Sequence, residues 1–475
     1  MPADAAPLPD GFRIALDDSV RRLDDGTVLC GGSPLRLLRL TAGGRRLVDR
    51  LAAGEVVPPT GGAQRLVRRL LDAGIAQPVP GSPSFAATDV AVVVPTHDDA
   101  AALARTLATI GSVGQVVVVD DGSADADAVA DVARAHVADL VRHDRTLGPG
   151  AARDSGWVMT SSPVVAFVDA DVEVTPGWLE ALLAHLNDPS VAAVAPRVVA
   201  RPGGIGWLDA YETARSPLDM GPRQGPARPR SWVPYVPTAT VVVRRAALVD
   251  VGGFDGALRY GEDVDFVWRL GASGWSVRYE PVVTVTHPAR PTADGWLRQR
   301  VAYGTSAAPL AARHGRALAP LAVSLWSALV WVLAGLGFRK TALAVAAVTG
   351  ALLVPKLRAL DHPAAEAARL AGLGHLFAGR AVADAIRRPW WPLALVAAVL
   401  SRRARRGVAL ALAVPPLLEW YERRPSLDPL RWSAARLADD VAYGTGVWIG
   451  CARERRVDAL VPDLASWPGR RDLDV

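Results

Sequence analysis

Two closely spaced carboxylates, Asp169 and Asp171, directly follow the apolar run PVVAFV. Carboxylates two residues apart at the end of a strand can share one divalent cation. Hard oxygen ligands suit Mg²⁺ or Mn²⁺, with phosphate oxygens completing the coordination shell. Such an ion would neutralise charge on a departing diphosphate. A pair of this kind also arises by chance in solvated loops, but its place after a fully apolar strand favours a metal site.

A second acidic strand end lies in VVVVDDGSADADA, where Asp120 and Asp121 close another apolar run. A carboxylate here can accept hydrogen bonds from a nucleotide base or a ribose hydroxyl. Acids in residues 123–127 also fit a helix N-cap and an acidic first turn, and the two interpretations are compatible. A third run, VAVVVP, ends at Thr96, His97 and Asp98. Polar and acidic side chains therefore gather where three apolar runs end.

A glycine-rich turn, DRTLGPGAARDSGW, places Arg153 at the start of an expected helix. An arginine can clamp a phosphate with two parallel hydrogen bonds. A structural pairing with one of the aspartates of the sheet is the alternative. Arg153 is therefore a candidate ligand of phosphate groups, and the ion pair with an aspartate is the alternative.

The segment GGFDGALRYGEDVDFVWRL holds the acidic residues Glu262, Asp263 and Asp265 at a helix start. Acids there are ordinary capping residues, but a carboxylate fixed after a glycine-rich loop can also serve as a general base. Removal of a proton from an attacking hydroxyl requires such a group. Downstream, RYEPVVTVTH ends at His287, a candidate third metal ligand, although a lone histidine at a strand end is more often structural.

The elements that must position these residues are uninterrupted apolar runs of strand length alternating with helix-like stretches from about residue 89. Runs without polar alternation are typical of parallel strands buried on both faces. Strands alternating with helices predict an α/β fold with a doubly wound sheet, whose ligands bind beyond the carboxyl ends of the strands. Candidate site residues lie at those ends.

The flanks differ in composition. Residues 33–54 and 62–74 contain two stretches with helical spacing of leucines, and residues 74–89 form a Pro/Gly/Ser-rich linker. Beyond residue 316 the chain is rich in Ala, Leu, Val and Trp, and residues 317–338 include no charged side chain, enough to cross a bilayer core. SRRARRG separates two shorter apolar stretches, a pattern that favours a cytoplasm-facing hairpin on anionic lipid. A soluble Ala-rich helical bundle is the alternative.

Composition bounds the remaining options. With 475 residues the chain should form two or three domains, and its net charge of +5 favours anionic partners only mildly. Two cysteines provide neither a disulfide framework nor a cysteine-based zinc site. We find no pattern of a signal peptide and expect no nucleic-acid partner.

In the order VVVP-Thr, DDGS, G-x-ARD-x-G, DADVEV and GGFD…GEDVDF-x-WRL, residues 89–290 closely resemble family 2 glycosyltransferases with the GT-A fold. The resemblance implies an inverting transfer from a UDP-sugar with Mg²⁺ or Mn²⁺. By position it implies a catalytic base at Asp263 with Glu262 beside it, and a metal and ribose site at Asp169 and Asp171. It implies that the donor is bound by Pro95, Thr96, Asp98, Asp121, Arg153 and Asp169. His97-Asp98 stands where the family usually has Tyr-Asn, and the Gln-x-x-Arg-Trp motif of processive synthases is missing.

The flanks carry a second resemblance. GGSPLRLLRLTAGGRRLVDRLAAG looks like a small winged-helix-like peptide-binding domain of the PqqD type, and RVAYGTSAAPLAARHG completes a pattern similar to glycosyltransferases of mycofactocin systems. This resemblance implies β-linked transfer of glucose from UDP-glucose onto a modified peptide, a redox-cofactor precursor, including several units in succession. The peptide or its carrier protein would then contact the N-terminal domain.

We therefore expect a PqqD-like domain at residues 1–80, a GT-A domain at 88–315 and an apolar helical region at 316–475. That region would hold the protein at the cell membrane with the catalytic domain facing the cytoplasm. Two alternatives remain: transfer to a polyprenyl phosphate or membrane glycolipid, and a non-catalytic peptide-binding adaptor.

Overall fold

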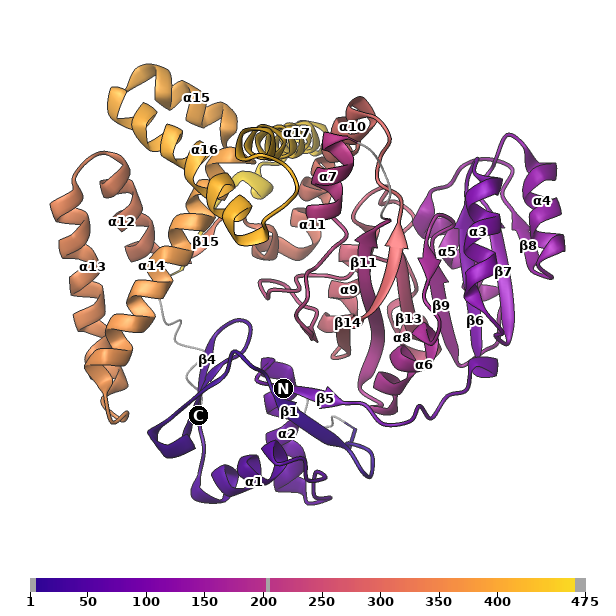
Figure 1. The fold of residues 1–475 in the computed structure, drawn as a ribbon, viewed down its shortest axis with the longest axis horizontal. Helices are drawn as coiled ribbons and strands as arrows, with labels where there is room; N and C mark the ends of the chain where they lie inside the picture. The colour runs from indigo at the N-terminus through magenta and orange to yellow at the C-terminus, as the bar shows by residue number, and fades with distance from the viewer. Residues whose placement is uncertain (1–5, 202–205, 466–475) are drawn as a thin grey trace. The chain divides into compact units, whose positions relative to one another are not determined.

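The computed structural model describes residues 6–201 and 206–465 and divides into two compact units (Figure 1). The first comprises Met1–Gly203 and Arg215–Ala289, and the second comprises Gly204–Ala214 and Arg290–Val475. The N-terminal segment thus shares a unit with the large sheet. Residues 293–314, which we grouped with the catalytic domain, lie in the second unit.

A nine-stranded mixed sheet forms the centre of the first unit, in the order β10-β14-β11-β13-β9-β6-β7-β8, with β12 paired to β14. Its strands are β6 (Val90–Thr96), β7 (Gln115–Asp120), β8 (Asp139–Arg142), β9 (Val164–Val168), β10 (Glu173–Val174), β11 (Val191–Ala200), β12 (Gly225–Pro226), β13 (Thr240–Arg244) and β14 (Ser276–His287). The strands β6, β7, β8 and β9 are parallel neighbours, as predicted. An unpredicted strand, β13, runs antiparallel between β9 and β11, so the sheet is mixed.

Helices flank this sheet. They are α3 (Ala100–Ile110), α4 (Ala126–Ala135), α5 (Pro149–Val158), α6 (Trp178–Leu183), α8 (Arg245–Val251) and α9 (Glu262–Ala272), with short 3₁₀ turns at Ala87–Asp89 and Ala184–Asn187. Helix-like stretches that alternate with the strands after residue 89 are confirmed as α3, α4 and α5. Valines of β6, β7 and β9 pack with Leu103, Leu107 and Val129 in one core, because uninterrupted apolar strands have two faces to bury.

The N-terminal segment has a small core of its own. Its elements are β1 (Arg13–Leu16), β2 (Arg21–Leu23), a 3₁₀ turn (Asp24–Gly26), β3 (Val28–Gly31), β4 (Arg36–Arg39), α1 (Ala42–Ala52), α2 (Gly61–Ala73) and β5 (Ala76–Val79). The helical prediction for residues 33–54 was wrong in its first half. There β4 pairs with β3, and the helix begins only after Thr41, whose hydroxyl accepts a hydrogen bond from Gly44 N at 3.1 Å. The predicted linker likewise begins with a strand, since β5 pairs with β1.

The N-terminal segment is fastened to the large sheet by buried polar contacts. The Arg68 guanidinium donates to both carboxylate oxygens of Asp188, at 2.5 and 3.0 Å. Arg278 of β14 donates to Gln77 Oε1 at 2.6 Å. All four side chains are buried, so the loss of one partner would leave a buried polar group unpaired. These contacts therefore hold the segment against the sheet.

The second unit is helical. It contains α7 (Trp207–Ala214), α10 (Ala293–Thr305), α11 (Ala307–His314), α12 (Leu325–Gly335), α13 (Arg339–Leu353), α14 (Pro363–Arg387), α15 (Trp391–Leu400), α16 (Arg402–Arg423) and α17 (Pro429–Glu454). Short pieces complete it: 3₁₀ turns at Gly315–Leu318, Val354–Leu357 and Asp458–Leu460, and the parallel strands β15 (Ala322–Ser324) and β16 (Asp463–Ala465). The uncharged stretch 317–338 is therefore not one long helix, since β15 interrupts it and α12 has only 11 residues. Among the described residues, one helix, Arg339–Leu357, is long and apolar enough to cross a membrane.

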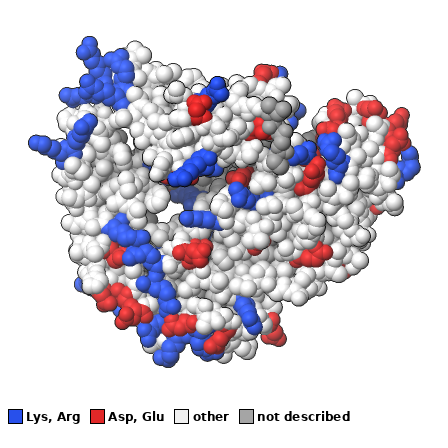
Figure 2. Space-filling view, viewed as in Figure 1, with Lys and Arg blue, Asp and Glu red and all other residues white. Residues whose placement is uncertain are grey.

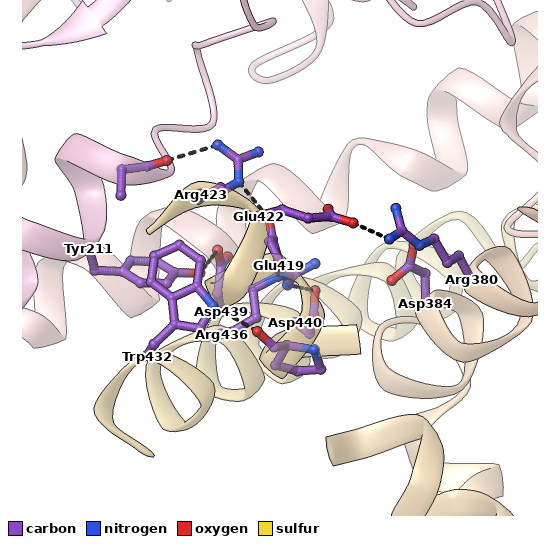
Figure 3. A network of polar contacts seen from close by, with 12 residues as sticks. Tyr211, Arg380, Asp384, Glu419, Glu422, Arg423, Trp432, Arg436, Asp439 and Asp440 are labelled. Carbon is purple, nitrogen blue, oxygen red and sulfur yellow. Dashed lines mark hydrogen bonds and ion pairs between the residues drawn. The ribbon is translucent and has the colours of Figure 1, made fainter. Parts of the chain in front are cut away.

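Buried ion pairs hold α7, α10, α16 and α17 together. Arg300, 2 % exposed, binds Glu212 and Asp439, and the Tyr211 hydroxyl donates to Asp439 at 2.8 Å. Figure 3 shows part of this network, in which Arg436 reaches Glu419 and Asp440. These charged side chains pair with one another between helices, so we assign the network a structural role.

Candidate active site

The strand register brings one predicted metal pair together. Glu173 lies opposite Thr286 where β10 meets β14, so the residues just before β10 face the end of β14. As a result, Asp171 Oδ2 lies 3.3 Å from His287 Nε2, with the two side chains 32 % and 16 % exposed. A carboxylate and an imidazole that are close together and reachable from solvent can bind one cation.

Asp169, the other half of the predicted metal pair, is engaged by Arg153. Arg153 donates to Asp169 Oδ1 at 2.7 Å and to Glu262 Oε1 at 3.0 Å. Burial alone would lower the pKa of Arg153, but the two carboxylates raise it above its ordinary value, so the guanidinium stays charged. The structure therefore confirms the alternative that Arg153 pairs with an aspartate of the sheet, here Asp169. Arg153 connects the metal end of the site to the acidic start of α9.

The predicted base, Asp263, is the second residue of α9 and is partly buried. Its Oδ1 accepts a hydrogen bond from Val264 N at 2.8 Å. Burial, together with the charge of neighbouring Glu262, raises the pKa of Asp263 to about 7. A carboxyl with this pKa can both take up and release a proton near neutral pH. By contrast, Asp265 is buried in an ion pair with Arg269 at 2.7 Å and is structural.

The predicted donor-binding residues lie at the ends of β6 and β7. Pro95 and Thr96 end β6, and the Thr96 hydroxyl is buried without a hydrogen-bond partner. Asp98 follows with a positive φ of 56° and ties the two strand ends together, since its Oδ1 accepts from Ala124 N at 2.7 Å. Its side chain is about half exposed. Contact of these positions with a nucleoside stays a prediction of the family resemblance.

The carboxylate of Asp121, one of the predicted donor-binding residues, is held by hydrogen bonds from other parts of the chain. Oδ1 accepts from Leu147 N at 2.8 Å and contacts His143 Nδ1 at 2.7 Å, while Oδ2 accepts from Gly148 N at 2.8 Å. The residue is only 5 % exposed. Asp121 therefore fixes the loop that leads into α5, and through that helix it fixes Arg153.

Sequence reasoning missed two residues of this site. His143 joins Asp121 to Ser155 on α5 through Nε2 at 2.8 Å, and no motif marks it. Arg201 directly follows β11, donates its backbone N–H to His287 O at 2.8 Å, and forms an ion pair with Glu173 at 2.7 Å. A basic residue directly after an apolar strand was the available signal for Arg201.

The side chains of the site offer few ligands for a divalent cation. No group of three or more His, Cys, Asp or Glu side chains converges within residues 6–201 and 206–465. Asp171 and His287 form a two-ligand pair, and phosphate oxygens would have to complete the shell. Magnesium prefers oxygen ligands, so the imidazole shifts the balance towards Mn²⁺.

Comparisons with known proteins identify the family of the chain. The model of glycosyl transferase family 2 matches residues 91–252, the segment that holds β6 to β13. The chain belongs to family 2 and is a glycosyltransferase whose catalytic domain has a GT-A-like fold with a mixed sheet. A purely non-catalytic adaptor is thereby disfavoured.

Over almost its whole length the chain is also similar to one particular protein. It is 41 % identical over 474 residues to the pre-mycofactocin glycosyltransferase of Mycobacterium tuberculosis (strain ATCC 25618 / H37Rv), covering 97 % of this chain and 99 % of that protein. Glycosyltransferase AglE of Haloferax volcanii is 27 % identical over 214 residues, 42 % of this chain and 67 % of AglE. Mannosyltransferase PcManGT from Pyrobaculum calidifontis, solved with GDP-Man and Mn²⁺, aligns with a TM-score of 0.38 and 21 % identity over 63 % of this chain and 87 % of that one.

Proposed function

We propose that the protein transfers glucose from UDP-glucose, in β-linkage and with inversion, onto pre-mycofactocin, a modified peptide that is a redox-cofactor precursor. Repeated transfer would build a short oligosaccharide. The similarity to the pre-mycofactocin glycosyltransferase, which extends through both flanks, supports this acceptor. The observation that carries the chemistry is the connection made by Arg153 between Asp169 and Glu262, because it couples the donor end of the site to the residue next to the proposed base, Asp263.

The residues of the chain would act in one displacement step. The acceptor hydroxyl attacks the anomeric carbon of the donor sugar as the bond from that carbon to the UDP oxygen breaks. Asp263, deprotonated, takes the hydroxyl proton, and its pKa of about 7 suits that task. Thr96 and Asp98 would contact the nucleoside, and Arg153 would hold Asp169 and Glu262 in place. Attack from the face opposite the leaving group inverts the anomeric configuration.

Asp171 and His287 would hold a Mn²⁺ or Mg²⁺ ion beside the donor diphosphate. When bound, the ion supplies positive charge that stabilises the leaving UDP. Arg201, ion-paired with Glu173, would help to fix the end of β14 that carries His287.

The N-terminal segment would bind the peptide or its carrier. In the sheet β2-β3-β4, β4 is an edge strand, and Leu35 and Leu37 beside and within it are 43 % and 39 % exposed. An edge strand with open backbone groups and alternate apolar side chains can accept an extended peptide as an additional strand. These features support the proposal of a PqqD-like peptide-binding role.

The test is a transfer assay with purified protein, UDP-glucose and Mn²⁺ or Mg²⁺, in which the modified peptide and a polyprenyl phosphate compete as acceptors. Metal-dependent glycosylation of the peptide, lost in both Asp171→Asn and Asp263→Asn, is the expected result. An acceptor phosphate is already deprotonated and needs no general base. Glycosylation of the lipid alone, retained in Asp263→Asn, would therefore replace the peptide acceptor with a lipid phosphate and remove Asp263 as the base.

A further inference from the structure

Two helical hairpins in the second unit, α12–α13 and α15–α16, expose large apolar side chains. Leu343 on α13 is 71 % exposed, and Val399 and Leu400 at the end of α15 are 80 % and 81 % exposed. The remaining exposed apolar side chains of these helices are Leu325, Trp326, Leu329, Val332, Leu336, Phe338, Val348, Leu352, Leu393, Leu395, Val396, Leu410, Val414, Leu417, Leu418 and Tyr421. An apolar surface of this extent marks an interaction site.

Polar groups of the same region are paired between helices. Ser327 Oγ on α12 lies 3.0 Å from His375 Nδ1 on α14, and Thr349 Oγ1 on α13 lies 2.8 Å from His375 Nε2. Trp331 Nε1 donates to the carbonyl oxygen of His375 at 2.6 Å. These polar atoms thus find partners inside the bundle, while many leucines and valines lie outside it. They match the pattern expected beside lipid.

The tips of the two hairpins lie together and are strongly cationic. The guanidinium carbon of Arg403, at the start of α16, lies 5.3 Å from the ring centroid of Phe338, at the turn between α12 and α13. The exposed cations at these tips are Arg339, Lys340, Arg402, Arg403, Arg405 and Arg406. The sequence has no Asp or Glu at residues 295–360 or 385–418, so no carboxylate from these hairpins balances them. In Figure 2 a group of blue atoms without red neighbours lies over the region where Figure 1 labels α15.

We propose that these hairpin tips, defined by residues 336–340 and 399–406, form a membrane-binding surface for an anionic lipid bilayer. The cations contact lipid headgroups while Leu336, Val399 and Leu400 insert beneath them. The cytoplasmic leaflet carries the negative surface potential that attracts such clusters, which keeps the catalytic unit in the cytoplasm with its nucleotide-sugar donor.

The tips lie in one leaflet and do not cross it. At about 1.5 Å per residue, the 11 residues of α12 and the 10 of α15 extend only about half of the ~30 Å hydrocarbon core, so neither hairpin can cross it with both of its helices, although Arg339–Leu357 alone is long enough. Six cations at the tips also oppose their passage through hydrocarbon. This surface is independent of the transfer chemistry, so the two proposals can fail separately.

Vesicle co-sedimentation of the full chain tests the surface. We expect binding to phosphatidylcholine vesicles that contain phosphatidylglycerol, little binding to phosphatidylcholine alone, and weakening by salt. The triple charge reversal Arg402→Glu, Arg405→Glu and Arg406→Glu should weaken binding about 100-fold or more, since each cation near an anionic surface contributes roughly a five-fold affinity gain. The control reversal Arg13→Glu, Arg46→Glu and Arg65→Glu changes net charge equally at exposed positions of the N-terminal segment and should bind nearly as wild type.

A probe of insertion separates lipid contact from association between copies. Cys30 and Cys451 are buried, so an environment-sensitive fluorophore on Leu400→Cys reports the α15 end. Its emission should shift to the blue when anionic vesicles are added and stay unchanged with protein concentration alone. A blue shift that follows protein concentration without lipid would assign the surface to a second copy of the chain. Equal binding of wild type and triple variant to both kinds of vesicle would also overturn the proposal.

Discussion

At the scale of single residues, the proposed transfer chemistry depends on Asp263, a carboxyl whose pKa is raised. Burial and the charge of Glu262 raise the pKa of Asp263 to about 7. Asp263 therefore loses its proton as pH rises through that value. We expect kcat/KM of wild type to rise with pH and to level off above about 7, because only the deprotonated form accepts the acceptor proton. Asp263→Asn should lower kcat by about 10²–10⁴-fold. Steady-state rates between pH 5 and 9 provide the measurement.

Glu262 offers a separate test of the cause of that shift. Its negative charge raises the pKa of Asp263, so Glu262→Gln should move the acid limb of the pH profile to lower pH. Glu262 also accepts from Arg153, so the variant can lose rate as well. An acid limb that stays at the wild-type pH in Glu262→Gln would contradict the contribution of Glu262 to the raised pKa of Asp263.

The metal pair makes a prediction about ion affinity. In Asp171→Asn and in His287→Ala, the Mn²⁺ concentration for half-maximal activity should rise on the order of 10-fold or more, since even indirect partners of a metal site typically matter by 10–100-fold. Titration of activity with Mn²⁺ measures this. Asp131→Asn, at an exposed carboxylate on α4, is the control and should titrate as wild type. An unchanged Mn²⁺ requirement in both site variants would contradict the assignment.

At the scale of elements, close helix packing in the second unit depends on glycines. A Cβ at Gly304 of α10 would lie 2.1 Å from the backbone oxygen of Tyr443 on α17, so the two helices would have to separate. We expect Gly304→Ala to lower the free energy of unfolding by about 1–3 kcal/mol, as overpacking does.

Gly372 on α14 is the matched control for this effect. It is exposed, and a Cβ there would meet nothing within 4 Å. Gly372→Ala should therefore raise stability by roughly 0.5–1 kcal/mol through helix propensity alone. Denaturant unfolding measures the free energy of unfolding of both variants. Equal changes in that free energy would show that α10 and α17 do not require close contact.

At the scale of the whole molecule, two units with separate cores should respond separately to damage. Arg300→Leu leaves Glu212 and Asp439 as buried charges with a lost partner, which costs about 3–5 kcal/mol. Hydrogen exchange should then speed up in α7, α10 and α17, while amides of β6, β7 and β9 keep their protection. Uniformly faster exchange in both units would instead indicate one cooperative structure.

The sequence by itself determined the strands β6, β7, β9 and β11, the helices α3, α4 and α5, and the acidic residues at the strand ends. These features depend on local patterns: uninterrupted apolar runs, glycine turns and capping residues. The same local reasoning placed Asp263 at a helix start and His287 at a strand end. It was misled at residues 33–54, where leucine spacing suited a helix but pairing with β3 made Arg36–Arg39 a strand.

Only the tertiary structure decided how the site residues are used. Arg153 and Glu262 meet across 109 positions of sequence, and the loop that occupies the Asp121 carboxylate lies 26 and 27 residues beyond it. β13, inserted antiparallel between β9 and β11, likewise has its partners elsewhere in the chain. An ion pair or a strand pairing depends on which distant groups the fold brings within about 3 Å, and no local pattern encodes that distance.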